Sequence, residues 1–136
     1  MTLKELLIKH ESKRLRPYKC PAGKLTIGVG RNLDDKGITE EEAMYLLDND
    51  IKAIISSCRE TFSWFAFLDN VRQAVVVSMI FNLGLGGFLG FKNTIAAIRE
   101  KDWNRAADNM LQSKWAEQVG NRALELAEMM RDGRFE

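Results

Sequence analysis

The sequence predicts a mostly helical α+β protein with one small sheet near its N-terminus. Apolar residues recur at helical spacing within residues 1–11 and again over long stretches after residue 39. Between them, residues 18–33 read as short strands around the turn sequence Pro21-Ala22-Gly23. The chain has 136 residues, 46% of them hydrophobic, which suits a single domain with a substantial core.

The first predicted helix carries a candidate acid at its end. Thr2 and Glu5 have the spacing of a capping box, and the helix should end before Pro17. Glu11 prolongs an apolar stripe formed by Leu3, Leu6, Leu7 and His10. A carboxyl group beside apolar neighbours has a raised pKa, which suits a general acid near neutral pH. A structural ion pair between Glu11 and a nearby Lys or Arg explains a glutamate at this position equally well.

The middle of the chain predicts a loop and then a long helix. Residues 34–37 have the composition of a loop, and Thr39 with Glu42 forms a second capping box. One apolar face then continues for about five turns, roughly 30 Å at 1.5 Å per residue, through Ala43, Leu47, Ile51, Ile54 and Cys58. Cys58 on this face is interpreted as a small buried hydrophobe. Gly28 and Gly30 lack the third glycine and the βαβ unit of a dinucleotide site, so they are expected to permit close backbone approach.

The remaining segments predict a helical region with a buried centre. Residues 71–83 are apolar nearly all round, as in a buried helix, and the four glycines within 84–90 suggest short turns. The aromatic residues before this helix are expected to pack where elements meet: Phe62, Trp64, Phe65 and Phe67. Three further helices are expected to begin at caps Asn93, Asp102 and Asn121, and Gly133 should end the last one.

Charge and composition exclude several classes of protein. Residues 1–31 carry a net charge of +6 and residues 32–60 one of −5, so the first segment would attract an anionic polymer. It lacks a recognition-helix pattern and a run of stacking aromatics, which argues against nucleic acid. Two cysteines and one histidine indicate neither a disulfide framework nor a metal site, and we expect no cofactor. We find no signal peptide and no apolar run of about 18 residues, so we expect no stable membrane insertion.

A motif in the N-terminal region resembles a known family. Glu11 is followed after eight residues by Cys20 and after five more by Thr26, a spacing similar to the catalytic signature of the bacteriophage lysozymes (endolysins) of glycoside hydrolase family 24. The resemblance continues to the end of the chain through further blocks in the same order: Thr26-Ile27-Gly28-Val29-Gly30, Phe81-Asn82-Leu83-Gly84, Gly90-Phe91, Asp102-Trp103 and Asn121-Arg122.

This resemblance implies a lysozyme-like two-lobed fold. A small N-terminal sheet lobe of about residues 12–58 would be joined by a long helix to a helical C-terminal lobe of about residues 59–136. The helix of residues 1–11 would pack with the second lobe, and the whole would form one monomeric domain. An endolysin without a signal peptide would be made in the host cytoplasm and reach the cell wall through a membrane hole formed by a holin.

The resemblance also implies hydrolysis of the β-1,4 bond between N-acetylmuramic acid and N-acetylglucosamine in bacterial peptidoglycan, with inversion. Glu11 would be the acid, oriented by Arg122, and Cys20 would stand where many relatives have aspartate. Thr26 would hold the attacking water, and Lys19 with the basic segment would lower the pKa of the thiol. The implied sugar contacts are Asn32, Phe81, Thr94 and Asn109.

Two other functions remain open from the sequence. A lytic transglycosylase also uses one glutamate, but it needs no water and forms a 1,6-anhydro sugar. The missing aspartate favours this reading, whereas Thr26 favours a bound water. The second alternative is an inactive wall-binding module, against which the intact Glu11 argues.

Overall fold

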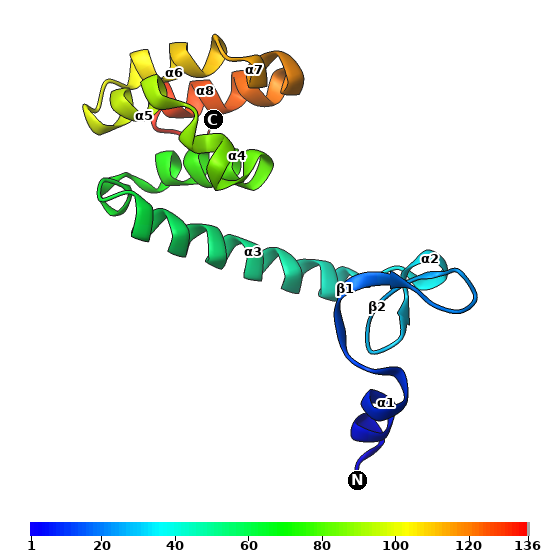
Figure 1. Cartoon of the computed structure of the whole chain (residues 1–136). Helices are drawn as coiled ribbons and strands as arrows, with labels where there is room; N and C mark the ends of the chain where they lie inside the picture. The colour runs from blue at the N-terminus through cyan, green and yellow to red at the C-terminus, as the bar shows by residue number, and fades with distance from the viewer. Residues whose placement is uncertain (136) are drawn as a thin grey trace. The chain divides into compact units, whose positions relative to one another are not determined.

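The computed structural model describes residues 1–135 and has the predicted class, mostly α with one small antiparallel sheet (Figure 1). Its contacts divide the chain into two compact units, residues 1–46 (the N-terminal unit) and Leu47 onward (the C-terminal unit). The lobe boundaries implied by the resemblance, and the packing of residues 1–11, stay predictions. The elements are α1 (Leu3–Glu11), β1 (Arg14–Lys19), β2 (Leu25–Gly28), β3 (Arg31–Asn32), α2 (Leu33–Lys36), α3 (Glu40–Thr61), η1 (Phe65–Phe67), α4 (Asn70–Leu89), α5 (Lys92–Arg99), α6 (Trp103–Leu111), α7 (Lys114–Val119) and α8 (Asn121–Asp132).

The sheet of the N-terminal unit begins earlier than the sequence predicts. Its three antiparallel strands lie in the order β1-β2-β3, and β1 starts at Arg14 instead of residue 18. Pro17 fits inside β1 because an edge strand does not need every N–H for the ladder. The pairing of β1 with β2 is irregular between Arg14 and Tyr18, and the Arg14 guanidinium lies 4.3 Å from the Tyr18 ring centroid.

The predicted loop at residues 34–37 is mostly one helical turn, α2. The Asn32 side chain caps it, since the Asp35 backbone N–H donates to Asn32 Oδ1 at 3.1 Å. The Asp34 carboxylate accepts a 2.6 Å hydrogen bond from the Leu25 backbone and so ties α2 to β2. Four residues are too few to show apolar periodicity, so the sequence pattern alone predicts a loop here.

Both predicted capping boxes are confirmed. At α1, Glu5 N donates to Thr2 Oγ1 and Thr2 N to Glu5 Oε2. At α3, Thr39 N donates to Glu42 Oε1 at 2.9 Å, and Arg31 binds both carboxylate oxygens of Glu42 at 2.8 Å. The Arg31 pair, followed by the hydrogen bond from Thr39, lowers the pKa of Glu42 to about 2. The start of α3 is thereby fastened to β3.

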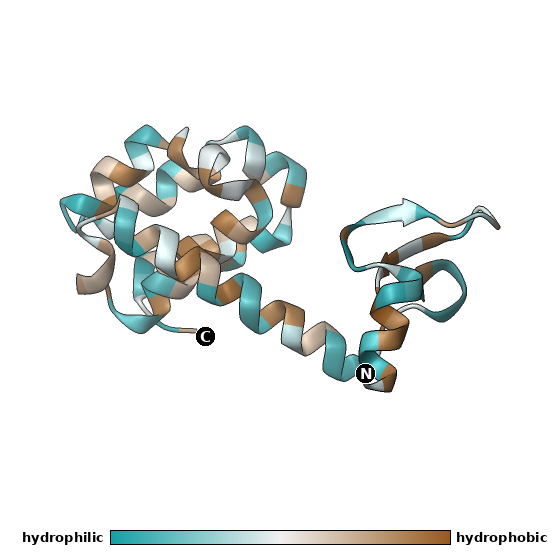
Figure 2. Ribbon diagram, turned by 60° about the horizontal axis from the view of Figure 1, so that its bottom comes forward, coloured by the Kyte–Doolittle hydropathy of each residue, from teal (hydrophilic) through white to brown (hydrophobic). Residues whose placement is uncertain are grey.

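The C-terminal unit is built around one apolar core. Apolar and polar segments alternate along its helices (Figure 2), as expected of helices with one face turned inward. Cys58 is fully buried there, as predicted, and burial raises its pKa to about 11. Phe62 and Phe65 are buried, whereas Phe67 is 84% exposed, so the expected packing of these aromatics fails at Phe67.

Helix α4 runs through this core, and its own helical geometry is interrupted at one residue. Gly84 has φ +77° and ψ 163°, but the chain resumes helical turns to Leu89, so the predicted series of short turns is wrong. Among residues 1–135, α4 alone is long and apolar enough to cross a membrane, so the prediction that no such run exists is wrong, whereas the expectation of no stable membrane insertion stays a prediction. Core helices of soluble proteins meet the same criterion, and α4 has five buried side chains: Val75, Val76, Met79, Ile80 and Phe88.

Two of the three predicted helix caps are wrong. Phe91 precedes α5 and Gly120 precedes α8, neither with a side-chain cap, so Asn93 and Asn121 lie inside their helices. Asp102 does cap α6, accepting from the Arg105 N–H at 3.2 Å. Gly133 ends α8 in the left-handed conformation, as predicted. Helix α7, capped by Ser113, was not predicted.

Candidate active site

Glu11 ends α1 and points at a glycine. The chain after it has an unusual conformation, since Ser12 has φ +66° and ψ 164°. A Cβ built on Gly30 would lie 2.9 Å from Glu11 Oε2, so the carboxylate lies against the bare backbone of the β2–β3 turn. Within the described chain α1 buries none of its residues, so the apolar burial expected at Glu11 is not found in its own unit.

The Cys20 thiol lies at the β1–β2 turn and has a lowered pKa. The turn is closed by two hydrogen bonds, from Cys20 N to Lys24 O at 2.9 Å and from Gly23 N to Cys20 O at 2.8 Å. Hydrogen bonding from the Lys24 backbone lowers the pKa of Cys20 most, partly opposed by desolvation; Ala22 and Thr26 add smaller effects in the same direction as Lys24. The expected direction is therefore found, but its main cause is the turn and not the charge of Lys19.

Thr26 holds a buried hydroxyl beside this thiol. Its residue is 3% exposed, the one buried residue of the N-terminal unit, and Oγ1 donates to Lys24 O at 2.9 Å. A hydroxyl has a single proton, so Thr26 can donate to Lys24 O or to the Cys20 sulfur, but not to both at once. In the first case its oxygen is free to accept from a water.

Thr94 and Asn109, two of the predicted sugar contacts, line one cavity of the C-terminal unit. Its volume is about 500 Å³, and its other lining residues are mainly polar: Gly90, Phe91, Lys92, Asn93, Gln112 and Ser113. Thr94 is 1% exposed. Amides and hydroxyls around a concave surface match the donors and acceptors of a sugar. The lining contains one cation and no acid.

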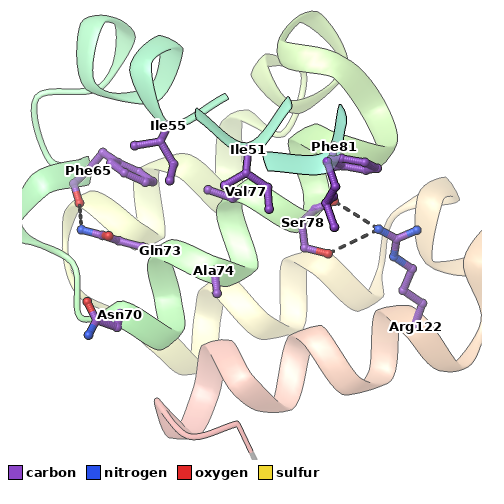
Figure 3. A pocket seen from close by; sticks show the side chains of 11 residues that line it. Ile51, Ile55, Phe65, Asn70, Gln73, Ala74, Val77, Ser78, Phe81 and Arg122 are labelled. Carbon is purple, nitrogen blue, oxygen red and sulfur yellow. Dashed lines mark hydrogen bonds between the residues drawn. The ribbon is translucent and has the colours of Figure 1, made fainter. Parts of the chain in front are cut away.

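Phe81 and Arg122 line a second, mainly apolar cavity of about 430 Å³ in the same unit (Figure 3). Arg122 Nη2 donates to both the backbone oxygen and Oγ of Ser78, each at 3.3 Å. Ser78 was not singled out from the sequence, since its contact with Arg122 joins residues 44 positions apart. The contact fixes one nitrogen of the guanidinium and leaves other N–H groups able to bind a carboxylate.

Asn32, the fourth predicted sugar contact, is already engaged in the N-terminal unit. Its Nδ2 donates to Asp35 Oδ2 at 2.9 Å, while its Oδ1 caps α2. A sugar contact there would have to share this amide. The close backbone approach expected at Gly28 and Gly30 is found at Gly30, which faces Glu11, and not at Gly28, where a Cβ would meet nothing within 4 Å. Ser12, next to Glu11, is a residue that sequence reasoning missed. The described chain contains no cluster of His, Cys, Asp or Glu suited to a metal.

Comparison with known proteins finds relatives of the whole chain. A probable T4-type lysozyme of Dictyostelium discoideum is 29% identical over 161 aligned positions, covering 97% of this chain and 95% of that protein. The pre-baseplate central spike protein Gp5 of Enterobacteria phage T4 is 26% identical and covers all of this chain, which spans 28% of Gp5. An endolysin of Acyrthosiphon pisum secondary endosymbiont phage 1 is 33% identical over 61% of this chain and 58% of its own length. Residues 8–131 match the phage lysozyme family, and the chain belongs to that family.

Proposed function

We propose that this protein is an endolysin that hydrolyses the β-1,4 bond between N-acetylmuramic acid and N-acetylglucosamine in bacterial peptidoglycan. Membership of the phage lysozyme family supports hydrolysis of peptidoglycan in general. The observation that carries the specific proposal is the grouping of three groups in one unit: the Glu11 carboxyl at the β2–β3 turn, the Cys20 thiol at the β1–β2 turn and the Thr26 hydroxyl in β2.

Glu11 supplies the proton that the leaving sugar oxygen needs. Cleavage of a glycosidic bond requires protonation of the bridging oxygen as its bond to the anomeric carbon breaks. Contact with Gly30 brings the exposed carboxyl against the β2–β3 turn. Arg122 is the proposed partner of Glu11 on the resemblance to the phage lysozymes alone; within its own unit its guanidinium donates to Ser78.

Cys20 and Thr26 handle the attacking water. In an inverting hydrolysis the water oxygen bonds to the anomeric carbon on the face opposite the leaving group, and one water proton must be removed. The lowered pKa of Cys20 favours the thiolate, which takes that proton. Thr26, whose own proton is held by Lys24 O, accepts a hydrogen bond from the same water and orients it.

The glycan strand binds through the polar cavity of α5 and α6. Thr94 and Asn109 are its proposed contacts, together with Phe81 as an apolar surface and Asn32 from the sheet. Phe81 is half exposed and can stack on a sugar ring. The basic segment of residues 1–31 would raise the local concentration of an anionic wall polymer.

The proposal is tested with cell-wall suspensions and purified variants. Glu11→Gln keeps the shape of the side chain but removes its transferable proton, so clearing of the suspension should fall by at least about 100-fold. Glu40→Gln, on an exposed site of the same unit, should stay within twofold. Activity of Glu11→Gln within tenfold of the parent would remove Glu11 from the acid role. Arg122→Ala should lower the rate and move the acid limb of the pH profile.

Product analysis separates hydrolysis from the transglycosylase alternative. The parent should release free reducing ends of initial α configuration, followed by NMR before mutarotation, and no 1,6-anhydro sugar. Cys20→Asp should keep substantial activity, since a carboxylate also takes a proton from water, whereas Cys20→Ala should lose most of it. An anhydro product, or full activity of Cys20→Ala, would contradict the role given to Cys20. No cleavage at all would favour a binding module.

A further inference from the structure

Gly28, which ends β2, and Gly30, in the β2–β3 turn, both have positive φ but different surroundings. Gly28 has φ +69° and Gly30 has φ +68°. A Cβ on Gly28 would meet nothing within 4 Å, whereas a Cβ on Gly30 would lie 2.9, 3.0 and 3.1 Å from the Oε2, Cδ and Cγ of Glu11. All three contacts of Gly30 are with the end of one side chain, and that side chain is the proposed acid.

We propose that Gly30 is a positioning residue. Because glycine has no side chain, the Glu11 carboxyl can lie directly against its Cα, and we call this contact the seat of the carboxyl. The reason for glycine at position 30 is then the space required by the acid as well as the turn. At position 28, where β2 ends and the chain enters the turn, the positive φ alone accounts for the glycine, because a Cβ there would meet nothing within 4 Å. The inference rests on the acid role proposed for Glu11.

A Cβ added at position 30 should displace the Glu11 carboxyl and leave the fold of the unit intact. Real Cβ atoms essentially never approach another atom within 3.0 Å, so a methyl group on Gly30 forces something to move. The Glu11 carboxyl is the far end of a flexible, exposed side chain and yields at small energetic cost, whereas the hydrogen-bonded turn does not. A methyl group would therefore displace the carboxyl while the sheet stays in place.

Such a displacement matters because proton transfer depends on geometry. A general acid must reach within hydrogen-bond distance of the oxygen that it protonates, and a misplacement of about 1 Å can lower a rate about 100-fold. The backbone on the other side of Glu11 gives little freedom to compensate, since Ser12 N donates to Ile8 O at 2.9 Å and closes α1 just behind it. The acid is thus confined between the end of α1 and the β2–β3 turn.

Gly30→Ala and Gly28→Ala form a matched pair that isolates this contact. Both place a Cβ at the same positive φ and should lower the thermal midpoint of the N-terminal unit by similar amounts. With soluble glycan strands, Gly30→Ala should lower kcat by tenfold to 100-fold with KM within twofold, and should move the acid limb of the pH profile. Gly28→Ala should match the parent in kcat and in the shape of the profile, once compared at equal folded fraction.

A readout without substrate separates this inference from the proposed function. The ¹³C resonance of the Glu11 carboxyl, assigned by its absence in Glu11→Gln, should change in shift and titration in Gly30→Ala and not in Gly28→Ala. That result would support the contact between Gly30 and the Glu11 carboxyl even if the protein cleaves no glycan. In that case only the proposed acid role of Glu11 would be wrong. Equal perturbation in both variants, or none in either, would overturn the inference. So would unfolding confined to Gly30→Ala, since the carboxyl would then not have yielded.

Discussion

The two units of this chain are held together by different interactions. The C-terminal unit has a continuous core of buried apolar side chains, whereas Thr26 is the one buried residue of the N-terminal unit among the described residues. Instead of an apolar core, the N-terminal unit has helix caps and ion pairs at its surface. Two of these pairs are Arg31 with Glu42 and Lys24 with Asp35. We infer that the unit carrying the acid and the thiol is stabilised mainly by polar contacts, and that its stability depends on pH and salt more than that of the helical unit.

The largest effect is expected in the core of the C-terminal unit. Phe65 is 0% exposed and Phe67 is 84% exposed, two residues apart in the same short helix. Phe65→Ala should destabilise this unit by about 3–5 kcal/mol, the cost of an aromatic cavity. Phe67→Ala should stay within about 0.5 kcal/mol.

Tryptophan fluorescence in urea measures both substitutions, because Trp64, Trp103 and Trp115 all belong to the C-terminal unit. A cost for Phe67→Ala equal to that of Phe65→Ala would mean that the exposed ring is covered in solution. A small cost for both would contradict the core.

The two cysteines lie in different units and are expected to differ in their reactivity. Cys20 is half-buried with a lowered pKa, while burial raises the pKa of Cys58 to about 11. Since the thiolate is the reactive form, the two thiols should differ in alkylation rate at pH 8 by at least about 100-fold. Mass spectrometry of timed digests should show Cys20 modified in the native protein and Cys58 only after unfolding. Equal rates would place Cys58 outside the core.

The fold was predictable where side chains close to one another in sequence determine it. The capping boxes of Thr2 and Thr39 and the cap of Asp102 follow from residues three positions apart. The starts of α5 and α8 were missed because Phe91 and Gly120 offer no side-chain cap to recognise. The strand through Pro17 was missed because its edge position depends on the whole sheet.

The candidate site shows the same division. Glu11, Cys20 and Thr26 are marked by their spacing, and Thr94 and Asn109 do share one cavity. What faces Gly30 could not be read from the sequence, because the contact joins the end of α1 to a turn 19 residues away. The lowered pKa of Cys20 was expected from positive charge, yet it comes mostly from backbone hydrogen bonding within the turn.

A fall in pH should weaken the N-terminal unit before the C-terminal one. Glu42 has an ordinary pKa of 4.5 and a folded pKa of about 2, so the folded state favours the ionised carboxyl. The stabilisation is complete above pH 4.5 and is lost as the pH falls toward 2. Amide exchange should therefore accelerate in β2, β3 and the start of α3 between these values, while the tryptophan signal of the C-terminal unit holds.

Glu42→Gln is the matched variant, since it removes the titrating group and keeps the shape. It should exchange faster than the parent at pH 7 and change less with pH between 4.5 and 2. Salt should reduce the difference between variant and parent, because the Arg31–Glu42 pair is partly exposed. An unchanged pH dependence would show that this pair does not hold the N-terminal unit together.

The smallest effect is expected at Ser12, where the N-terminal unit carries backbone strain next to the acid. Its φ of +66° and ψ of 164° lie in a region that is essentially restricted to glycine, at a cost of about 1–3 kcal/mol for other residues. Ser12→Gly removes this cost but gives the unfolded chain more freedom, worth about 0.4–1 kcal/mol. The net result should be a gain of about 1 kcal/mol, measured by amide exchange of β1 and α1. Ser113→Gly is the contrast, because Ser113 has ordinary angles and caps α7, so it should lose a few tenths of a kcal/mol. A loss of stability in Ser12→Gly would show that the chain beside Glu11 is unstrained, and that the seat at Gly30 alone confines the acid.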